Sequence, residues 1–287
     1  MLASLIIVFR EIIEAGLIVG IVLAATRGVA GRGRMVAGGV AGGVLGACVL
    51  AAFAGRLGAL FAGSGQEVFN ATVLLGAVAM LTWHNVWMAS HGREMARELR
   101  AVGARVLSGE RPPAALAVVV GIAVLREGAE VVLFLYGVLS GGGTTAGEVA
   151  LGGVLGLAAG AGVAAMMYRG LLAIPAARLF QATSWLITLL AAGMAAQAMA
   201  FLQQGGFLQV LQSPLWDTSG VLSEGSIPGR LAHTLVGYTD QPDGLQLLAW
   251  LATIAAITTL ARVVRGRARP GGPASRRVAA ATAAAGE

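Results

Sequence analysis

The chain has 287 residues, of which 57% are hydrophobic and 12% charged, and its mean hydropathy is +0.79. This composition excludes an ordinary soluble domain and predicts an all-α, polytopic membrane protein. The net charge of +6 does not indicate a nucleic-acid partner, because most arginines lie between apolar segments and so report membrane topology.

Seven apolar segments are long enough to cross a bilayer, which takes about 20 helical residues. The expected spans are residues 2–25, 36–61, 69–89, 114–139, 147–168, 182–204 and 244–264.

We expect these spans to form one transmembrane domain over residues 1–264, in which residues 205–243 make the longest outer loop. Residues 265–287 are rich in Ala, Gly, Arg and Pro and have no apolar periodicity. That composition predicts a disordered tail.

The arginines predict the orientation of the spans. Sixteen of them follow the first, third, fifth and seventh spans, whereas the other face carries only Arg56 and Arg230. Because cytoplasmic loops carry the excess of basic residues, the N-terminus is expected outside and the C-terminus in the cytoplasm. The chain would then be a multi-pass protein of the cytoplasmic (inner) membrane.

Two of the expected spans carry the same charged motif, Arg-Glu-x-x-Glu. It occupies residues 10–14 in the first span and residues 126–130 in the fourth. An ionisable residue near the bilayer centre costs about 2.5–3.5 kcal/mol and is functional by default. The repetition of so costly a pattern indicates a functional site, formed by Arg10, Glu11, Glu14, Arg126, Glu127 and Glu130.

The motifs belong to an internal repeat, residues 2–89 and 114–204. In each half a charged helix is followed by a glycine-rich helix and then by a helix that starts with Phe-x-Ala-Thr, at residues 69–72 and 180–183. Three spans per half give the two halves opposite orientations. Secondary transporters commonly have this arrangement, with the substrate site at the repeat interface. The expected fold is therefore an inverted 3+3 repeat with a seventh helix added.

The glycine-rich spans are interpreted as packing surfaces. Glycines four residues apart share one helix face and let neighbouring backbones approach closely. We expect the second and fifth spans to press against the charged helices through Gly38, Gly42, Gly46, Gly152, Gly156 and Gly160.

Each motif places two carboxylates and one guanidinium on the same side of its helix, because residues three and four apart are neighbours there. Two antiparallel copies facing each other would form a cage of four carboxylates, kept ionised by the arginines. Oxygen ligands select hard cations, and neither motif contains the His or Cys that zinc or copper(I) favours. The alternative is that each arginine only neutralises its glutamates and locks the helices together.

Weaker candidates lie outside the motifs. His84 in the third span would either line the pathway or be a hydrogen-bonded structural histidine. Gln197 in the sixth span would line the pathway or bond across helices, and bonding is favoured. Asp217 and Glu224 in the outer loop would either concentrate cations at the mouth or simply be solvated.

The paired motifs resemble the signature of the oxidase-dependent iron permease family, which includes yeast high-affinity ferric iron permeases and bacterial members. The similarity covers about residues 1–264 and includes Trp-His-Asn-Val-Trp-Met at residues 83–88 and a stretch from Leu215 through Tyr238. The family motif is usually Arg-Glu-Gly-Leu-Glu, so this chain keeps only the charged frame in both copies.

The resemblance implies a permease, not an enzyme, that takes up iron across the cytoplasmic membrane. Glu11, Glu14, Glu127 and Glu130 would bind the ion, and Arg10 and Arg126 would support them. Iron would be the substrate, with no resident cofactor. Its partners would be membrane lipid and an extracytoplasmic ferroxidase or iron-delivery protein. Four glutamates and two arginines leave a formal charge of −2, which does not choose the oxidation state, so the preference for Fe³⁺ rests on the resemblance.

Two other functions remain open. A membrane di-metal carboxylate oxidase would also be built in a helix bundle, but such sites typically use Glu-x-x-His, which this sequence lacks. A proton-coupled carrier of another substrate would use the glutamates as proton relays.

Overall fold

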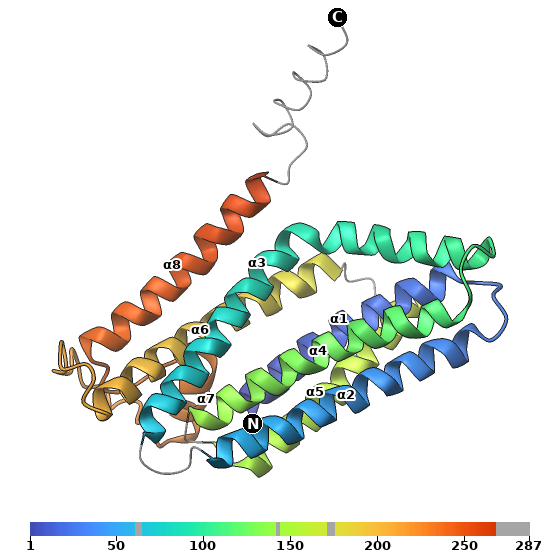
Figure 1. The fold of residues 1–287 in the computed structure, drawn as a ribbon. Coiled ribbons are helices and arrows are strands. Elements are labelled where there is room, and N and C mark those ends of the chain that lie inside the picture. The colour runs from blue at the N-terminus through green and yellow to red at the C-terminus, as the bar shows by residue number, and fades with distance from the viewer. Residues whose placement is uncertain (61–64, 142–143, 171–175, 268–287) are drawn as a thin grey trace, which may run out of the picture.

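The computed structural model describes residues 1–60, 65–141, 144–170 and 176–267. These residues form a bundle of α-helices (Figure 1), without a named β-strand and with one isolated antiparallel bridge between Pro214 and Asp243. The all-α prediction is confirmed. The helices are α1 (Leu2–Ala25), α2 (Arg32–Leu60), α3 (Gln66–Leu107), α4 (Ala114–Ser140), α5 (Ala146–Tyr168), α6 (Ala176–Gln204), α7 (Ile227–Val236) and α8 (Gly244–Arg267).

Among the described residues, five helices contain a segment that is long and apolar enough to cross a membrane. α1 and α4 have 24 and 27 residues, which is also enough length for a span, but each carries the three charges of its motif. The apolar helices are those of a multi-pass membrane protein. Their spanning segments are Arg32–Arg56, Gln66–Met88, Ala146–Tyr168, Gln181–Gln204 and Gly244–Val264.

α3 is longer than hydropathy alone indicates. The expected span ends at residue 89, but the helix continues to Leu107. Residues 90–107 contain many strong helix formers, such as Arg, Glu, Met and Ala. They also bury Leu99 and Val106, so tertiary packing adds to the intrinsic helix propensity of this polar segment.

The expected loop 205–243 contains α7, which we did not predict. Ser226 caps its first turn by accepting a hydrogen bond from the backbone N–H of Gly229 at 3.1 Å. Gly237 ends the helix in the left-handed conformation, with φ at +70°. These capping residues are signals that the sequence carries. Most of the expected tail, residues 268–287, lies outside the described residues.

α5 packs along α1 through the predicted glycine face. A Cβ at Gly156 would lie 2.5 Å from the carbonyl oxygen of Leu5. A Cβ at Gly160 would lie 2.9 Å from the Cβ of Ile12. No other residue type fits at such separations, so these glycines set the distance between the two helices. The predicted packing role of the stripe that begins at Gly152 is confirmed.

α2 packs in the same way on α4, but mainly through a different glycine face. A Cβ at Gly39 would lie 2.5 Å from a carbonyl oxygen of α4, and one at Gly43 would lie 2.7 Å from an α4 side chain. Gly38 and Gly42 meet no atom within 4 Å, so the prediction for these two was wrong. Gly46 does contact α4. Adjacent glycine rows leave the sequence ambiguous about which row faces the neighbouring helix.

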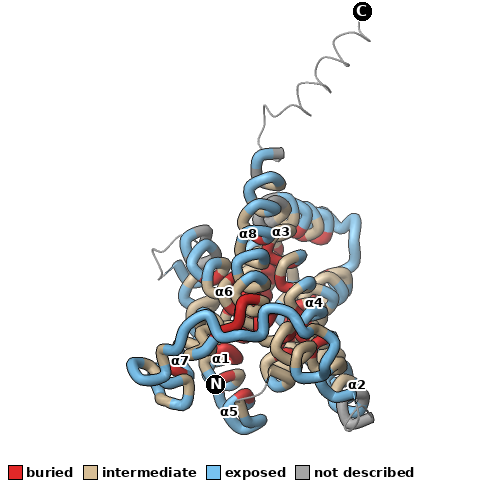
Figure 2. Tube along the Cα trace, turned by 90° about the vertical axis from the view of Figure 1, so that its left-hand side faces the viewer, coloured by how far each residue is buried: buried red, intermediate tan, exposed pale blue. Residues whose placement is uncertain are grey.

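Two apolar clusters fill the bundle, one on each side of the charged motifs along α1 and α4. The motif charges are therefore enclosed by apolar side chains at both ends, and Figure 2 shows buried residues gathered in the middle of the bundle. The first cluster contains Ala3, Ile7, Ala71, Leu74, Ala77, Leu81, Phe134, Ile187, Leu190, Ala191, Met194, Ala198 and Ile257. The second cluster contains Ala15, Ile18, Val22, Val36, Leu99, Val106, Leu116, Val120 and Val124.

Candidate metal centre

The two motifs meet between α1 and α4, which pack against each other. Glu11 and Glu14 share one face of α1, and Glu127 and Glu130 share one face of α4, because residues three apart are helix neighbours. All four glutamates are at most 3% exposed. The structure thus brings together the predicted carboxylates in the interior of the bundle.

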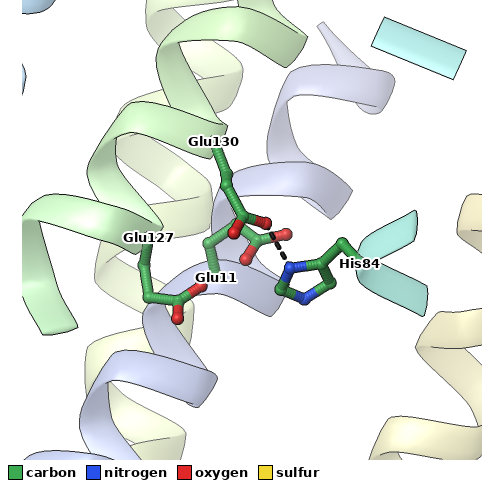
Figure 3. Close-up of side chains that lie close together, drawn as sticks. All are labelled: Glu11, His84, Glu127 and Glu130. Atoms are coloured by element: carbon green, nitrogen blue, oxygen red, sulfur yellow. Dashed lines mark ion pairs between the residues drawn. The ribbon is translucent and has the colours of Figure 1, made fainter. Parts of the chain in front are cut away.

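Four side chains gather most closely: Glu11, His84, Glu127 and Glu130. One ligand atom from each lies within 4.8 Å of the others, and all four residues are buried. Figure 3 shows the three carboxylates turned toward one another between α1 and α4, with the ring of His84 reaching in from α3. We call this set the carboxylate–histidine centre.

Glu14 lies beside this centre and is held by two partners. Its Oε1 atom lies 2.9 Å from Arg10 Nη2, and its Oε2 atom lies 3.2 Å from His84 Nε2. Arg10 also donates a hydrogen bond from Nη1 to Glu11 Oε1 at 2.9 Å, and its side chain is only 2% exposed. The first motif is therefore a buried ion-pair network in which one arginine serves both of its glutamates.

His84 connects the two motifs. Its Nε2 atom faces Glu14 on α1, and its Nδ1 atom faces Glu130 on α4 in direct contact. The neighbouring Asn85 fixes this part of α3 against α6: its amide donates to Thr188 Oγ1 at 3.1 Å and its Oδ1 accepts from Ser184 Oγ at 2.7 Å. The sequence marked His84 as a candidate, and the structure places it in the centre itself.

Arg126 differs from Arg10 although the motifs are the same. Its side chain is 36% exposed, and it donates one hydrogen bond, from Nε to Glu130 Oε1 at 3.2 Å. Its guanidinium lies 4.5 Å above the ring centroid of Trp87, a cation–π contact. Within the described part of the chain, no arginine nitrogen lies within ion-pair distance of Glu127. The second motif is therefore less neutralised than the first.

Two buried oxygens in the centre, Glu11 Oε2 and Glu127 Oε2, have neither a hydrogen-bond donor nor an ion-pair partner among the described residues. Buried polar groups are normally satisfied, and an unsatisfied carboxylate in a low-dielectric interior is costly. A cation held between these oxygens would satisfy both. The donor set of three carboxylates and one imidazole suits a hard or borderline divalent or trivalent metal ion.

His84 adds an imidazole to the ligand set, which bears on the choice of metal ion. Zinc and copper were disfavoured because neither motif contains a histidine or cysteine. The assembled centre does contain an imidazole, supplied by a third helix. Ligand type alone therefore does not exclude zinc from this site.

The remaining candidates lie at the end of the bundle where α7 is found. Gln197 lines a small cavity there. Asp217 is exposed and accepts hydrogen bonds from Ser219 Oγ at 2.6 Å and Ser219 N at 2.9 Å, which lower the pKa of the Asp217 carboxyl. Glu224 lies 3.2 Å from His233 Nδ1. Asp217 thus makes hydrogen bonds within its own loop, whereas Glu224 contacts the imidazole of His233.

Buried carboxylates and an imidazole inside a bundle of apolar helices are typical of the ion and substrate pathways of membrane proteins. The sequence profile of the Iron permease FTR1 family matches residues 1–265. The chain belongs to this family.

Similar proteins come from enteric bacteria. The chain is 32% identical over 261 residues to the ferrous iron permease EfeU of Escherichia coli O6:H1, an alignment that covers 87% of this chain and 91% of the relative. It is 31% identical over 258 residues to the ferrous iron permeases EfeU of Escherichia coli O157:H7 and Shigella sonnei, with the same coverage. No solved structure matches the chain.

Proposed function

We propose that this protein is an iron permease of the cytoplasmic membrane and that iron crosses through the carboxylate–histidine centre. The observation that carries the proposal is the gathering of four buried ligand atoms within 4.8 Å of one another in the middle of an apolar bundle. Membership of the iron permease family and the names of the relatives supply the identity of the ion.

The proposed topology has seven spans, with α1 and α4 crossing the membrane although they are charged. The expected repeat pairs α1 with α4, α2 with α5 and α3 with α6. The helix contacts support this: α1 packs chiefly on α5, and the corresponding pair, α4 and α2, packs to a similar extent. α3 packs on its own counterpart α6. Arginine asymmetry supports an orientation with the N-terminus outside and the C-terminus in the cytoplasm.

The residues have different roles in this proposal. Glu11, Glu127, Glu130 and His84 are ligands in the conformation described here. Glu14, whose oxygens are engaged by Arg10 and His84, becomes a ligand only when that network rearranges. Arg10 and Arg126 hold carboxylates in place. They also reduce the net negative charge of the centre when no cation is bound.

The oxidation state of the ion is a separate question. The prediction of Fe³⁺ stays a prediction. Fe²⁺ is the second candidate, because the two motifs have a formal charge of −2 that a divalent ion neutralises, and because imidazole nitrogen is a ligand that suits divalent iron. The relatives are also named as ferrous iron permeases.

The two alternative functions make different demands on the site. A di-metal oxidase needs ligands for two ions about 3.5–4 Å apart, typically with a histidine from each of two helices, whereas the centre holds one histidine. A proton-coupled carrier of another substrate would use the same glutamates without binding metal.

Uptake by purified protein in liposomes tests the proposal. We would compare Fe²⁺ kept reduced, Fe³⁺ as its citrate complex, and Mn²⁺, using wild type and Glu130→Gln. Glu130→Gln keeps the shape of the side chain but removes a charged oxygen ligand, so it should lower the rate of iron uptake at least tenfold. Glu98→Gln, at an exposed position of α3, is the matched control and should transport normally.

Three results would overturn parts of the proposal. Uptake by Glu130→Gln within twofold of wild type would remove the centre from the pathway. Transport of another substrate in metal-free buffer would favour the proton-coupled carrier. Oxygen consumption that depends on bound metal would favour the oxidase.

A further inference from the structure

A second polar feature lies on the route to the centre. A cavity of about 60 Å³ is lined by the start of α1, the end of α4, and parts of α3, α6 and α7, and it is partly open to the outside. Its polar lining includes Gln197 of α6 and His233 of α7, and its apolar lining includes Ala3 of α1 and Val138 of α4. In the proposed topology this is the outer end of the bundle.

The cavity and the centre lie on the same helix faces. On α1, Ala3 lines the cavity and Glu11 belongs to the centre. On α4, Val138 lines the cavity and Glu130 belongs to the centre. Each pair is separated by eight residues, which is about 12 Å along a helix. The cavity therefore lies in line with the centre, about two helical turns toward the outer face.

A layer of three apolar side chains separates them. Ile7 lies one turn from Ala3 and one turn from Glu11, and Phe134 occupies the corresponding position on α4. Leu81 is its counterpart on α3, one turn before His84. All three are 0% exposed and belong to the same apolar cluster. A hydrated cation cannot cross this layer without a movement of the helices, because it would lose its water with no ligand in exchange.

The cavity itself offers metal ligands. His233 Nδ1 lies 2.8 Å from the carbonyl oxygen of Tyr238, which can only accept, so this nitrogen carries a proton. In the neutral ring Nε2 then has the free lone pair, the form that binds metal ions. The Glu224 carboxylate, 3.2 Å from Nδ1, orients the ring as carboxylates do for metal-binding histidines. Gln197 also lines the cavity, and its side-chain carbonyl oxygen is of a type that can bind a metal ion.

We propose that this cavity is an outer vestibule that binds the cation transiently through His233 and Gln197, and that Ile7, Leu81 and Phe134 form the gate between it and the carboxylate–histidine centre. The proposal rests on the proposed function, since it assigns the outer part of the same pathway. It predicts that the vestibule affects how iron is captured, whereas the centre determines whether iron is transported.

Cysteine accessibility tests the vestibule and gate without measuring transport. In a Cys48→Ser background, which removes the exposed native cysteine, Ala3→Cys and Ile7→Cys would be treated in sealed right-side-out vesicles with a membrane-impermeant cationic thiol reagent. Ala3→Cys should react, and Ile7→Cys should react at least tenfold more slowly. Equal reaction rates for the two cysteines would contradict the proposed gate. An unreactive Ala3→Cys would contradict the proposed vestibule.

Uptake kinetics test the ligands. His233→Ala and Gln197→Ala should raise the iron concentration for half-maximal uptake at least fivefold and leave the maximal rate within twofold of wild type. Gln204→Ala, at an exposed position on the same helix, is the control for Gln197. If the iron concentration for half-maximal uptake is unchanged in both variants, His233 and Gln197 are not ligands of the cation.

His233→Asn separates ligation from folding. An asparagine amide can replace the Nδ1 donor to Tyr238 but offers nothing at the position of Nε2. This variant should therefore be as stable as wild type in detergent and as impaired in iron capture as His233→Ala. Wild-type capture by His233→Asn would show a structural role only. If wild type transports no iron at all, the proposed function fails, while the accessibility pattern still decides whether the vestibule exists.

Discussion

The two motif arginines should differ in how much they stabilise the fold. Arg10 is 2% exposed and pairs with both Glu11 and Glu14 at 2.9 Å. Arg126 is 36% exposed and, among the described residues, forms an ion pair with Glu130 alone. We therefore predict that Arg10→Gln destabilises the protein strongly and that Arg126→Gln does so weakly.

The structure sets the expected magnitudes. Removing one partner of a buried ion pair costs about 3–5 kcal/mol, because the remaining charge is left buried and unpaired. A pair with a partly exposed partner contributes at most about 1 kcal/mol. With about 2–4 °C per kcal/mol for a chain of this size, Arg10→Gln should lower the melting temperature by about 10 °C and Arg126→Gln by only about 2 °C.

The assay is thermal unfolding of purified protein in detergent, followed by loss of the monodisperse chromatographic peak. Arg97→Gln, at an exposed site on α3, is the control and should melt like wild type. The double change Arg10→Gln with Glu14→Gln should recover part of the loss, because it leaves fewer unpaired charges. Equal melting temperatures for the two single arginine variants would show that Arg10 and Arg126 stabilise the fold equally, contrary to this prediction.

Three further predictions concern His84, the glycines and the orientation. His84→Phe keeps a ring but removes both nitrogens, so calorimetry should show at least tenfold weaker iron binding to the purified protein; unchanged affinity would remove His84 from the ligands. Gly156→Leu should prevent accumulation of folded protein because α5 cannot then approach α1, whereas Gly38→Leu should be tolerated; equal yields in chromatography would contradict the packing described. A reporter fused after residue 287 should be active only in its cytoplasm-dependent form, and cleavage of the tail by external protease would contradict the orientation.

The carboxylates of the centre could be predicted from the sequence because they are local. Glu11 and Glu14 must share a face of any helix that contains them, and so must Glu127 and Glu130. The cost of placing these charges in an apolar segment marked both sets as functional. Such statements need only the helical period and the composition of one segment.

The contribution of His84 could not be predicted in the same way. Its place in the centre depends on the rotation of α3 about its own axis and on the polar contacts of Asn85 with α6. The same limit applies to the glycines: Gly38 and Gly39 both belong to rows spaced by four, and only helix packing shows that Gly39 faces α4. The unequal pairing of Arg10 and Arg126 likewise arises from different neighbours around identical motifs.

The glycine contacts group four of the helices into two closely packed pairs. α1 is fixed to α5, and α4 is fixed to α2, at separations that no side chain larger than glycine would permit. Each motif helix thus packs closely on its own partner helix, and the proposed ligands come from both pairs, with His84 added by α3. A sliding of one pair against the other would spread Glu11 away from Glu127 while leaving each arginine beside its own glutamate. In the proposed function, such a sliding would release the ion by separating the two helix pairs, and no helix would have to unwind.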